Sequence, residues 1–498
     1  MLQSTRSTFT ATDTRAVLMG IAPDGGLFVD PSMLTIPEAS RKSFVSACMG
    51  LKYPELSAKV MSALLPGFSA AGEMETITSV YKKKFTSKAV TPLVKVDEDY
   101  ALELYHGPTL AFKDVALSVL PLFITSAKRK EGIGETISIL TATSGDTGKA
   151  ALEGFHDVEG TDITVFFPYG GVSEMQRLQM VTQEGSNVRV CAVRGNFDDC
   201  QTGVKTTFAK KDAAPKKCLS SANSINIGRL VPQVVYYFSA YSQLIERKRI
   251  KFGDEVDFVV PTGNFGDILA GYIAKLMGLP VHRLVCASNS NNVLTDFITT
   301  GVYDRRRPFL KTVSPSMDIL VSSNLERLLY YVSSGDCGYV AGLMGELKEQ
   351  GFYRVEGTPF ARIGSLFSAG FCTEEETAAA IAYSWSENGY LMDTHTAVGF
   401  GVLEKYKAGP DYEGHPCVVL STASPFKFPG AVLRSIDMEL AEACDVDGDT
   451  PGDFLLAERL SKLTGVTMPK NLAALKRKPI LHTDVIDVAD IVKYSLCL

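Results

Sequence analysis

Lys113 is the residue of this chain whose surroundings best suit a lysine nucleophile. It follows the turn-forming residues Gly107 and Pro108 and precedes an apolar run at 115–120, so the pattern places it at the start of a helix. The positive end of the helix dipole disfavours an ammonium group there and favours the neutral amine. A neutral lysine amine can bond covalently to a carbonyl carbon. A solvent-exposed lysine without a chemical role is the alternative interpretation.

Two glycine-bearing loops indicate places where an anion could bind. One covers 141–148 (TATSGDTG) and the other 263–267 (GNFGD), and each joins a predicted strand to a predicted helix. Their small residues let backbone N–H groups approach a phosphate at a helix N-terminus. A tight turn with a capping Asp or Thr explains either loop alone equally well. Two such loops on one sheet favour a ligand that carries phosphate.

Other chemical signatures are missing from the sequence. Neither loop reads GxxxxGK[ST] or GxGxxG, which argues against a nucleotide site, and there is no GxSxG or HExxH motif. None of the ten cysteines forms CxxC or has a histidine at zinc-ligand spacing, so we expect reduced thiols and no metal site. We expect solvated or hydrogen-bonded side chains for five histidines outside any triad context: His106, His156, His282, His415 and His482.

The elements that must position these residues follow an alternating pattern. Short apolar runs predict strands at 137–140, 163–167, 256–260, 281–287 and 417–420, with helices after 148 and over 268–277. Strand, loop, helix and strand in this order predict an α/β fold with mostly parallel sheets and helices on both faces. Ligands of such sheets bind in the loops at the carboxyl ends of the strands. The first 90 or so residues read as helical, and the stretch after 430 is helical with a strand-like end at 484–491.

Composition limits the possible partners. Of the 498 residues, 45% are hydrophobic, and 50 Lys and Arg against 56 Asp and Glu give a formal charge of −6. A mildly acidic chain lacks the positive field that general nucleic-acid binding needs. The N-terminus has no apolar signal region, and no run of 18 apolar residues occurs. We therefore expect a soluble cytoplasmic protein that binds a small molecule and neither nucleic acid nor membrane.

Several of these segments together resemble the threonine synthase family, in its longer bacterial and fungal type. Residues 107–114 (GPTLAFKD) are similar to the family's pyridoxal-phosphate lysine motif, and 143–148 and 261–267 are similar to its ligand loops. Segments 4–6, 22–29, 318–327 and 395–399 also match in order. The resemblance runs from residue 4 to at least 428. It implies a fold type II pyridoxal-phosphate enzyme with an N-terminal domain at 1–92, a catalytic core of two sub-domains at 93–430 and a C-terminal helical segment at 431–498.

The resemblance also implies an activity. The family converts O-phospho-L-homoserine and water to L-threonine and phosphate, by loss of the γ-phosphate followed by addition of water at the β carbon. Lys113 would hold pyridoxal 5'-phosphate and move the protons. The matching cofactor residues are Gly263, Asn264, Phe265 and Asp267 at the phosphate and Thr422 at the pyridine nitrogen. The matching substrate residues are Asn223, Ser224 and Arg229 at the phosphate, with Ser144, Asp146 and Thr147 on the carboxylate side.

Two positions depart from the family pattern, and other functions stay open. Ser424 and Phe426 stand where the family generally has His and Ala, which concerns the rim of the site, and the role of His395 is left undecided. A related phospho-lyase that yields a 2-keto acid and ammonia would carry nearly the same motifs. A non-catalytic pyridoxal-phosphate protein would lack the substrate residues, and a nucleotide-binding regulator would need a nucleotide motif. We expect a monomer or homodimer.

Overall fold

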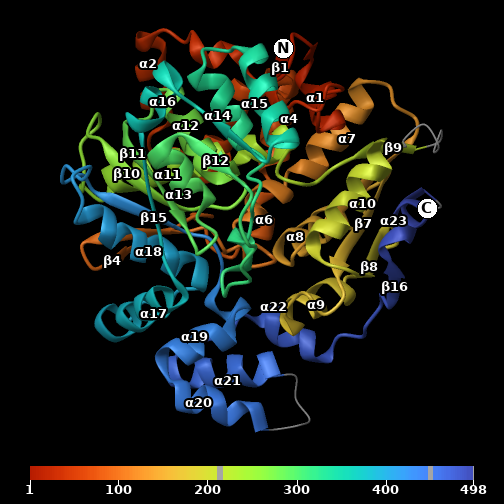
Figure 1. The fold of residues 1–498 in the computed structure, drawn as a ribbon, viewed down its shortest axis with the longest axis vertical. Helices are drawn as coiled ribbons and strands as arrows, with labels where there is room; N and C mark the ends of the chain where they lie inside the picture. Colours follow the sequence, from red (N-terminus) through yellow and green to blue (C-terminus); the bar gives the residue numbers. More distant parts are fainter. Residues whose placement is uncertain (210–216, 447–451, 497–498) are drawn as a thin grey trace.

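Two sheets lie side by side in the computed structural model, which describes residues 1–209, 217–446 and 452–496 (Figure 1). The larger has the strand order β14-β11-β10-β15-β5-β4, and only β4 and β5 pair antiparallel. Its strands are β4 (Leu93–Val96), β5 (Asp99–Glu103), β10 (Val256–Pro261), β11 (Val281–Ser288), β14 (Phe367–Phe371) and β15 (Cys417–Ser421). The predicted strands at 256–260, 281–287 and 417–420 are confirmed.

The second sheet is parallel throughout, in the order β16-β8-β7-β6-β9. Its strands are β6 (Thr136–Ala142), β7 (Thr161–Pro168), β8 (Val188–Arg194), β9 (Lys217–Ser220) and β16 (Asp484–Asp487). The strand-like pattern expected over 484–491 is confirmed for 484–487, which add an edge strand beside β8, and it is wrong for 488–491, which are helical. The stretch after 430 thus contributes a strand to the second sheet as well as forming helices.

Helices cover both sheets, as the alternating pattern predicts. The long helix α11 (Ile227–Glu246) is buried along most of its length, and it contacts α3, α6 and α12. The remaining helices of the two sheets are α6 (Lys113–Leu117), α7 (Leu120–Lys130), α8 (Asp146–Phe155), α9 (Glu174–Val181), α10 (Phe197–Ala209), α12 (Gly266–Leu276), α13 (Val293–Thr300), α14 (Leu325–Val332), α15 (Cys337–Glu349), α16 (Gly357–Gly364), α17 (Glu374–Asn388) and α18 (Thr394–Lys407).

The two ends of the chain pack against this core (Figure 1). The N-terminal region is helical as predicted, and it also holds a small antiparallel sheet of β1 (Leu2–Ser4), β2 (Thr10–Ala11) and β3 (Phe28–Val29). Its helices are α1 (Asp13–Met19), α2 (Glu38–Cys48), α3 (Tyr53–Leu64), α4 (Glu73–Thr78) and α5 (Tyr81–Lys84). The C-terminal helices are α19 (Pro429–Ile436), α20 (Met438–Glu442), α21 (Gly452–Thr464), α22 (Lys470–Ala473) and α23 (Ile491–Leu496).

Two helix boundaries bear on the site. Lys113 is the first residue of α6, as its sequence context predicts. Helix α12 begins at Gly266, two residues before the predicted start, because Phe265 takes a left-handed conformation at φ 60° and turns the chain there. No helix among the described residues has the length and apolar character to cross a membrane.

Close packing of α8 against α6 generates the first prediction. A Cβ added to Gly154 of α8 would lie 2.3 Å from the backbone oxygen of Leu117, the last residue of α6. Backbone cannot yield cheaply, and forced overpacking typically costs about 1–3 kcal/mol. We expect Gly154→Ala to lower the melting temperature measured by scanning calorimetry.

Gly345 is the matched control, because it lies inside α15 with open space where a Cβ would be. Alanine is favoured over glycine in a helix by roughly 0.5–1 kcal/mol. Gly345→Ala should therefore keep or raise the melting temperature. Equal melting temperatures for the two variants would show that the α6–α8 contact is not tight.

Candidate active site

A cavity of about 870 Å³ lies at the carboxyl ends of strands from both sheets. Its walls come from the segments that follow β5, β6, β9, β10 and β15. This is the edge where ligands of parallel sheets are expected. Every residue that the family resemblance assigns to the cofactor or the substrate lines this one cavity: Lys113, Ser144, Asp146, Thr147, Asn223, Ser224, Arg229, Gly263, Asn264, Phe265, Asp267 and Thr422.

Lys113 projects a buried amine into the cavity. Only 8% of the residue is exposed, and its Nζ donates to Ser316 Oγ at 3.4 Å. Burial lowers the pKa of Lys113 to about 8, although the nearby carboxylate of Asp146 opposes this shift. Asp146 Oδ2 is 3.8 Å from the Nζ atom. The lowered pKa raises the neutral fraction of the amine at pH 7 to roughly a tenth, and a lysine nucleophile reacts in this neutral form.

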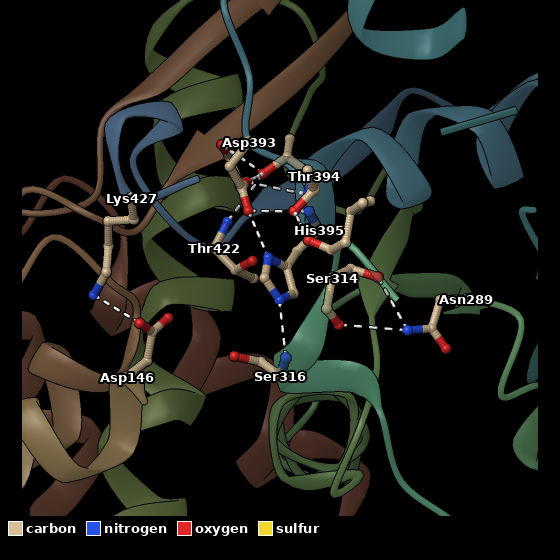
Figure 2. Close-up of polar contacts among 12 residues, drawn as sticks. Asp146, Asn289, Ser314, Ser316, Asp393, Thr394, His395, Thr422 and Lys427 are labelled. Carbon is tan, nitrogen blue, oxygen red and sulfur yellow. Dashed lines mark hydrogen bonds and ion pairs between the residues drawn. The ribbon is translucent and has the colours of Figure 1, made fainter. Parts of the chain in front are cut away.

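Asp146 is buried between two lysines. Its Oδ1 lies 2.8 Å from Nζ of Lys427, a side chain with no exposed surface (Figure 2). The same oxygen accepts a hydrogen bond of 3.0 Å from Gln176 Nε2. Burial alone would raise the pKa of Asp146, but the charges of Lys427 and Lys113 hold it well below its usual range. Asp146 therefore stays ionised, and the charge of Lys427 opposes the effect by which Asp146 raises the pKa of Lys113.

The loop 263–267 forms a cradle of backbone groups. No side chain caps the N-terminus of α12, so the N–H groups of its first turn are left for another acceptor. A Cβ on Gly263 would lie 2.6 Å from the backbone oxygen of Ser316, which explains the glycine. The carboxyl group of Asp267 accepts a hydrogen bond from the Tyr236 hydroxyl, and burial raises the pKa of Asp267 to about 7. The side chain of Asp267 thus anchors the loop from behind.

Arg229 is a buried cation on another wall of the cavity. Its Nη1 donates to the backbone oxygen of Ala222 at 2.5 Å, and within the described residues no carboxylate lies within ion-pair distance of it. Burial lowers the pKa of Arg229 to about 10, so it still carries its charge at neutral pH. Its Nε is buried without a hydrogen-bond partner, as are Asn223 Oδ1 and Asp267 Oδ2. Buried groups left in this state at the wall of a cavity are available to a ligand.

His395 connects the cavity wall to the lysine. Its Nδ1 lies 2.7 Å from Asp393 Oδ2, and its Nε2 accepts a hydrogen bond of 3.1 Å from the backbone N–H of Ser316 (Figure 2). The neutral ring with its proton on Nδ1 satisfies both contacts. His395 therefore holds Ser316, whose hydroxyl meets Lys113. Thr422 lies beside this ring, and its backbone oxygen accepts from Phe112 N–H at 2.8 Å.

Three residues at the site escaped the sequence analysis: Ser316, Gln176 and Lys427. Ser316 stands in no recognisable motif, whereas Gln176 belongs to the capping box Ser173–Gln176, a motif that marks the start of α9 and not a binding site. Lys427 directly follows Phe426, and in this segment the resemblance indicated only that Ser424 and Phe426 depart from the family pattern. Neither of those two residues lines the cavity, so the departures lie behind the wall rather than at the rim.

Comparisons with known proteins agree with this geometry. Residues 2–80 match the family described as threonine synthase N terminus, 85–342 the pyridoxal-phosphate dependent enzymes, and 396–490 the family described as threonine synthase, C-terminal. The chain is 40% identical over 436 residues to threonine synthase of Pseudomonas aeruginosa, covering 87% of this chain and 89% of that protein. The chain belongs to the threonine synthase family.

Two further relatives show how much of the chain is similar to known proteins. The crystal structure of PLP-bound threonine synthase from Brucella melitensis matches with a TM-score of 0.84 and 38% identity, over 100% of this chain and 98% of that one. Threonine synthase-like 1 of Homo sapiens is 37% identical over 441 residues, which is 86% of this chain and 58% of that protein. The predicted fold type II architecture and the pyridoxal-phosphate cofactor are confirmed.

The residues present fit that cofactor. A buried amine of lowered pKa suits an aldehyde, and an uncapped helix N-terminus suits a phosphate. The unpartnered buried atoms of Arg229 and Asn223 then remain for a second ligand. A threonine synthase needs both sites, because its cofactor and its substrate each carry a phosphate.

The lysine pair around Asp146 generates the second prediction. In Lys427→Met the positive charge that lowers the pKa of Lys113 is lost, and Asp146 keeps Lys113 as its cation. The pKa of Lys113 should therefore rise above about 8, and less neutral amine will be present at pH 7. We expect the pH at which the apoenzyme half-maximally attaches pyridoxal phosphate to move upward, measured by cofactor absorbance.

Two variants control this measurement. Lys427→Arg keeps the charge and should keep the midpoint near that of the parent, whereas Lys462→Met removes an exposed lysine of α21 and should leave it unchanged. An unshifted midpoint in a folded Lys427→Met protein would show that Lys427 serves packing alone.

Proposed function

We propose that this protein catalyses the pyridoxal-phosphate dependent conversion of O-phospho-L-homoserine and water to L-threonine and phosphate. Membership of the threonine synthase family supports this activity. The observation that carries it is the pairing, in one cavity, of a helix N-terminus free for a phosphate and a buried arginine that has no carboxylate partner in the part of the chain that the structure describes. A cofactor phosphate and a substrate phosphate together account for both.

Pyridoxal phosphate, when bound, supplies an electron sink that allows an unactivated γ-phosphate to leave. Lys113 is the residue to which it would be attached. The backbone N–H groups at Asn264, Phe265 and Asp267, made accessible by Gly263, would hold its phosphate. Thr422 would face the ring nitrogen with a neutral hydroxyl, and such a contact does not force that nitrogen to stay protonated.

The substrate would occupy the opposite part of the cavity. Arg229 would donate charge-assisted hydrogen bonds to its phosphate, with Asn223 and Ser224 as neighbouring donors. Ser144 and Thr147 would meet the α-carboxylate near the start of α8, where the helix dipole is positive. Asp146 is negatively charged and would repel that group, so its role is to position the lysines.

Proton transfer falls to Lys113. With a pKa near 8 its amine can accept a proton from a carbon acid and return it within one turnover. Ser316 holds the amine in place, and the Asp393–His395 pair holds Ser316. These contacts fix the direction of the amine, which is the protein's share of the catalysis.

The proposal extends to the setting of the enzyme. Its partner would be the small-molecule substrate alone, and it would act in the cytoplasm as a monomer or homodimer, without nucleic acid or membrane. The acidic net charge supports the expected lack of nucleic-acid binding, because it disfavours polyanionic partners.

Product analysis tests the function directly. We expect the purified protein to release threonine and phosphate from O-phosphohomoserine in equal amounts, and Lys113→Ala to lose this turnover because no amine remains to move protons. Release of a 2-keto acid and ammonia would identify the phospho-lyase. Cofactor binding without any product would identify a non-catalytic pyridoxal-phosphate protein.

Arg229 generates the fourth prediction. Loss of one charge-assisted contact costs about 1.5–3 kcal/mol, or roughly 10- to 150-fold. Arg229→Ala should therefore lose about that factor in kcat/KM for O-phosphohomoserine while it keeps the cofactor absorbance of the parent. Inorganic phosphate should inhibit the parent competitively and the variant much less.

Arg247→Ala is the matched control, because Arg247 is exposed directly after the same helix, α11. It should retain the kinetics of the parent. Loss of the cofactor from Arg229→Ala would place Arg229 at the cofactor phosphate instead, and unchanged kinetics would remove it from both phosphate sites.

A further inference from the structure

A second group of polar side chains gathers at the opposite edge of the larger sheet. His282 is the second residue of β11, and Glu413 and His415 lie just before β15. One ligand atom from each of these three residues lies within 4.8 Å of the other two. Because β10, β11 and β15 run parallel, this edge holds their amino ends, whereas the candidate active site lies at the carboxyl ends.

His282 is held in the orientation that a metal ligand needs. Its Nδ1 is 2.8 Å from Oδ1 of Asp257, a fully buried residue of β10. Asp257 is fixed in turn, since it accepts hydrogen bonds from the Arg283 N–H at 2.9 Å and from the Tyr406 hydroxyl at 2.8 Å. With the proton on Nδ1, the lone pair of Nε2 points away from Asp257. Metal-ligating histidines are commonly oriented by a carboxylate in this way.

The two other side chains stand where they can complete a site. His282 Nε2 is 3.6 Å from Glu413 Oε1, and the rings of His282 and His415 have centroids 4.2 Å apart. Nitrogen and oxygen ligands at zinc distances lie ~3.3 Å from one another in a tetrahedron. The side chain of Glu413 is 64% exposed, so it can move the few tenths of an ångström needed to approach His282. The three ligand atoms lie within 4.8 Å of one another, so a shift of the partly exposed His415 side chain completes the tetrahedral spacing.

We propose that His282, Glu413 and His415 bind one divalent transition cation, zinc in the first instance. Two imidazoles and a carboxylate are ligands that zinc accepts, and water would take the fourth position. Asp257 would position His282 without touching the metal. Bound metal would tie the segment before β15 to the start of β11. Since the catalytic cavity lies at the other end of these strands, the site is separate from the chemistry there.

Metal titration of the cofactor-loaded protein tests this inference. After treatment with a chelator, the protein is titrated with zinc chloride in a calorimeter and with cobalt chloride in a visible spectrometer. We expect one equivalent per chain and, for cobalt, the absorption of a tetrahedral ion. His282→Gln and His415→Gln should each weaken binding at least tenfold. Asp257→Asn should weaken it about 10- to 100-fold, as the loss of an orienting carboxylate does.

His156→Gln is the matched control, because it removes a partly buried histidine at the end of α8, outside the cluster. It should bind as the parent does. Zinc should also raise the melting temperature of the parent and of His156→Gln but not that of His415→Gln, which alters a residue outside the strands and should fold. Binding that persists in the double variant His282→Gln/His415→Gln would overturn the proposal, as would a parent protein that binds no zinc.

Discussion

Buried positive charge is the constraint on which the rest of this structure depends. Lys113, Arg229 and Lys427 all lie out of solvent around or behind one cavity, and Asp146 is the ionised carboxylate that contacts two of them. Buried cations are stable only when they are paired or when they lose their charge. Lys427 is paired with Asp146, and Lys113 has a lowered pKa. The buried Nε of Arg229 has no hydrogen-bond partner, so we propose that a bound anion pairs with this side chain. A cofactor and a substrate that each bring a phosphate complete this balance.

The fold creates the constraint by bringing strand ends together. Parallel strands of two sheets direct their carboxyl ends at the same space, so that α6, α8 and α12 each begin at the cavity wall. The first turns of α8 and α12 have no side-chain cap and offer N–H groups and a positive potential, whereas those of α6 are bonded to backbone oxygens of the protein. The same arrangement lowers the stability of an ammonium at Lys113 and raises that of a bound phosphate. One architectural feature therefore serves both the covalent attachment and the anion sites.

Much of this could be predicted from local sequence. The strands and the loops at 141–148 and 263–267 are visible because small residues follow apolar runs, and Lys113 is visible because its turn and its helix are adjacent. The sequence pattern did not predict the early start of α12, because it depends on the left-handed backbone conformation of Phe265, and phenylalanine rarely adopts that conformation. The position of β16 beside β8 joins distant segments, and only the pattern of a strand was apparent beforehand.

The missed site residues share one physical cause. Lys427, Ser316 and Gln176 act through contacts with residues 30 or more positions away, and no periodicity or spacing encodes such contacts. The family resemblance indicated Ser424 and Phe426 as unusual positions, but the neighbouring Lys427 is the residue that forms the ion pair with Asp146. Polar groups that act behind a cavity wall become evident only when burial and distance are known.

A crystal structure of the protein with pyridoxal phosphate and inorganic phosphate would test the charge balance most directly. The account predicts the cofactor joined to Lys113 with its phosphate at the N-terminus of α12, and a second phosphate within hydrogen-bond distance of Arg229. A cofactor phosphate bound to Arg229, or an Arg229 side chain that turns away from the cavity to a carboxylate of the protein, would contradict it.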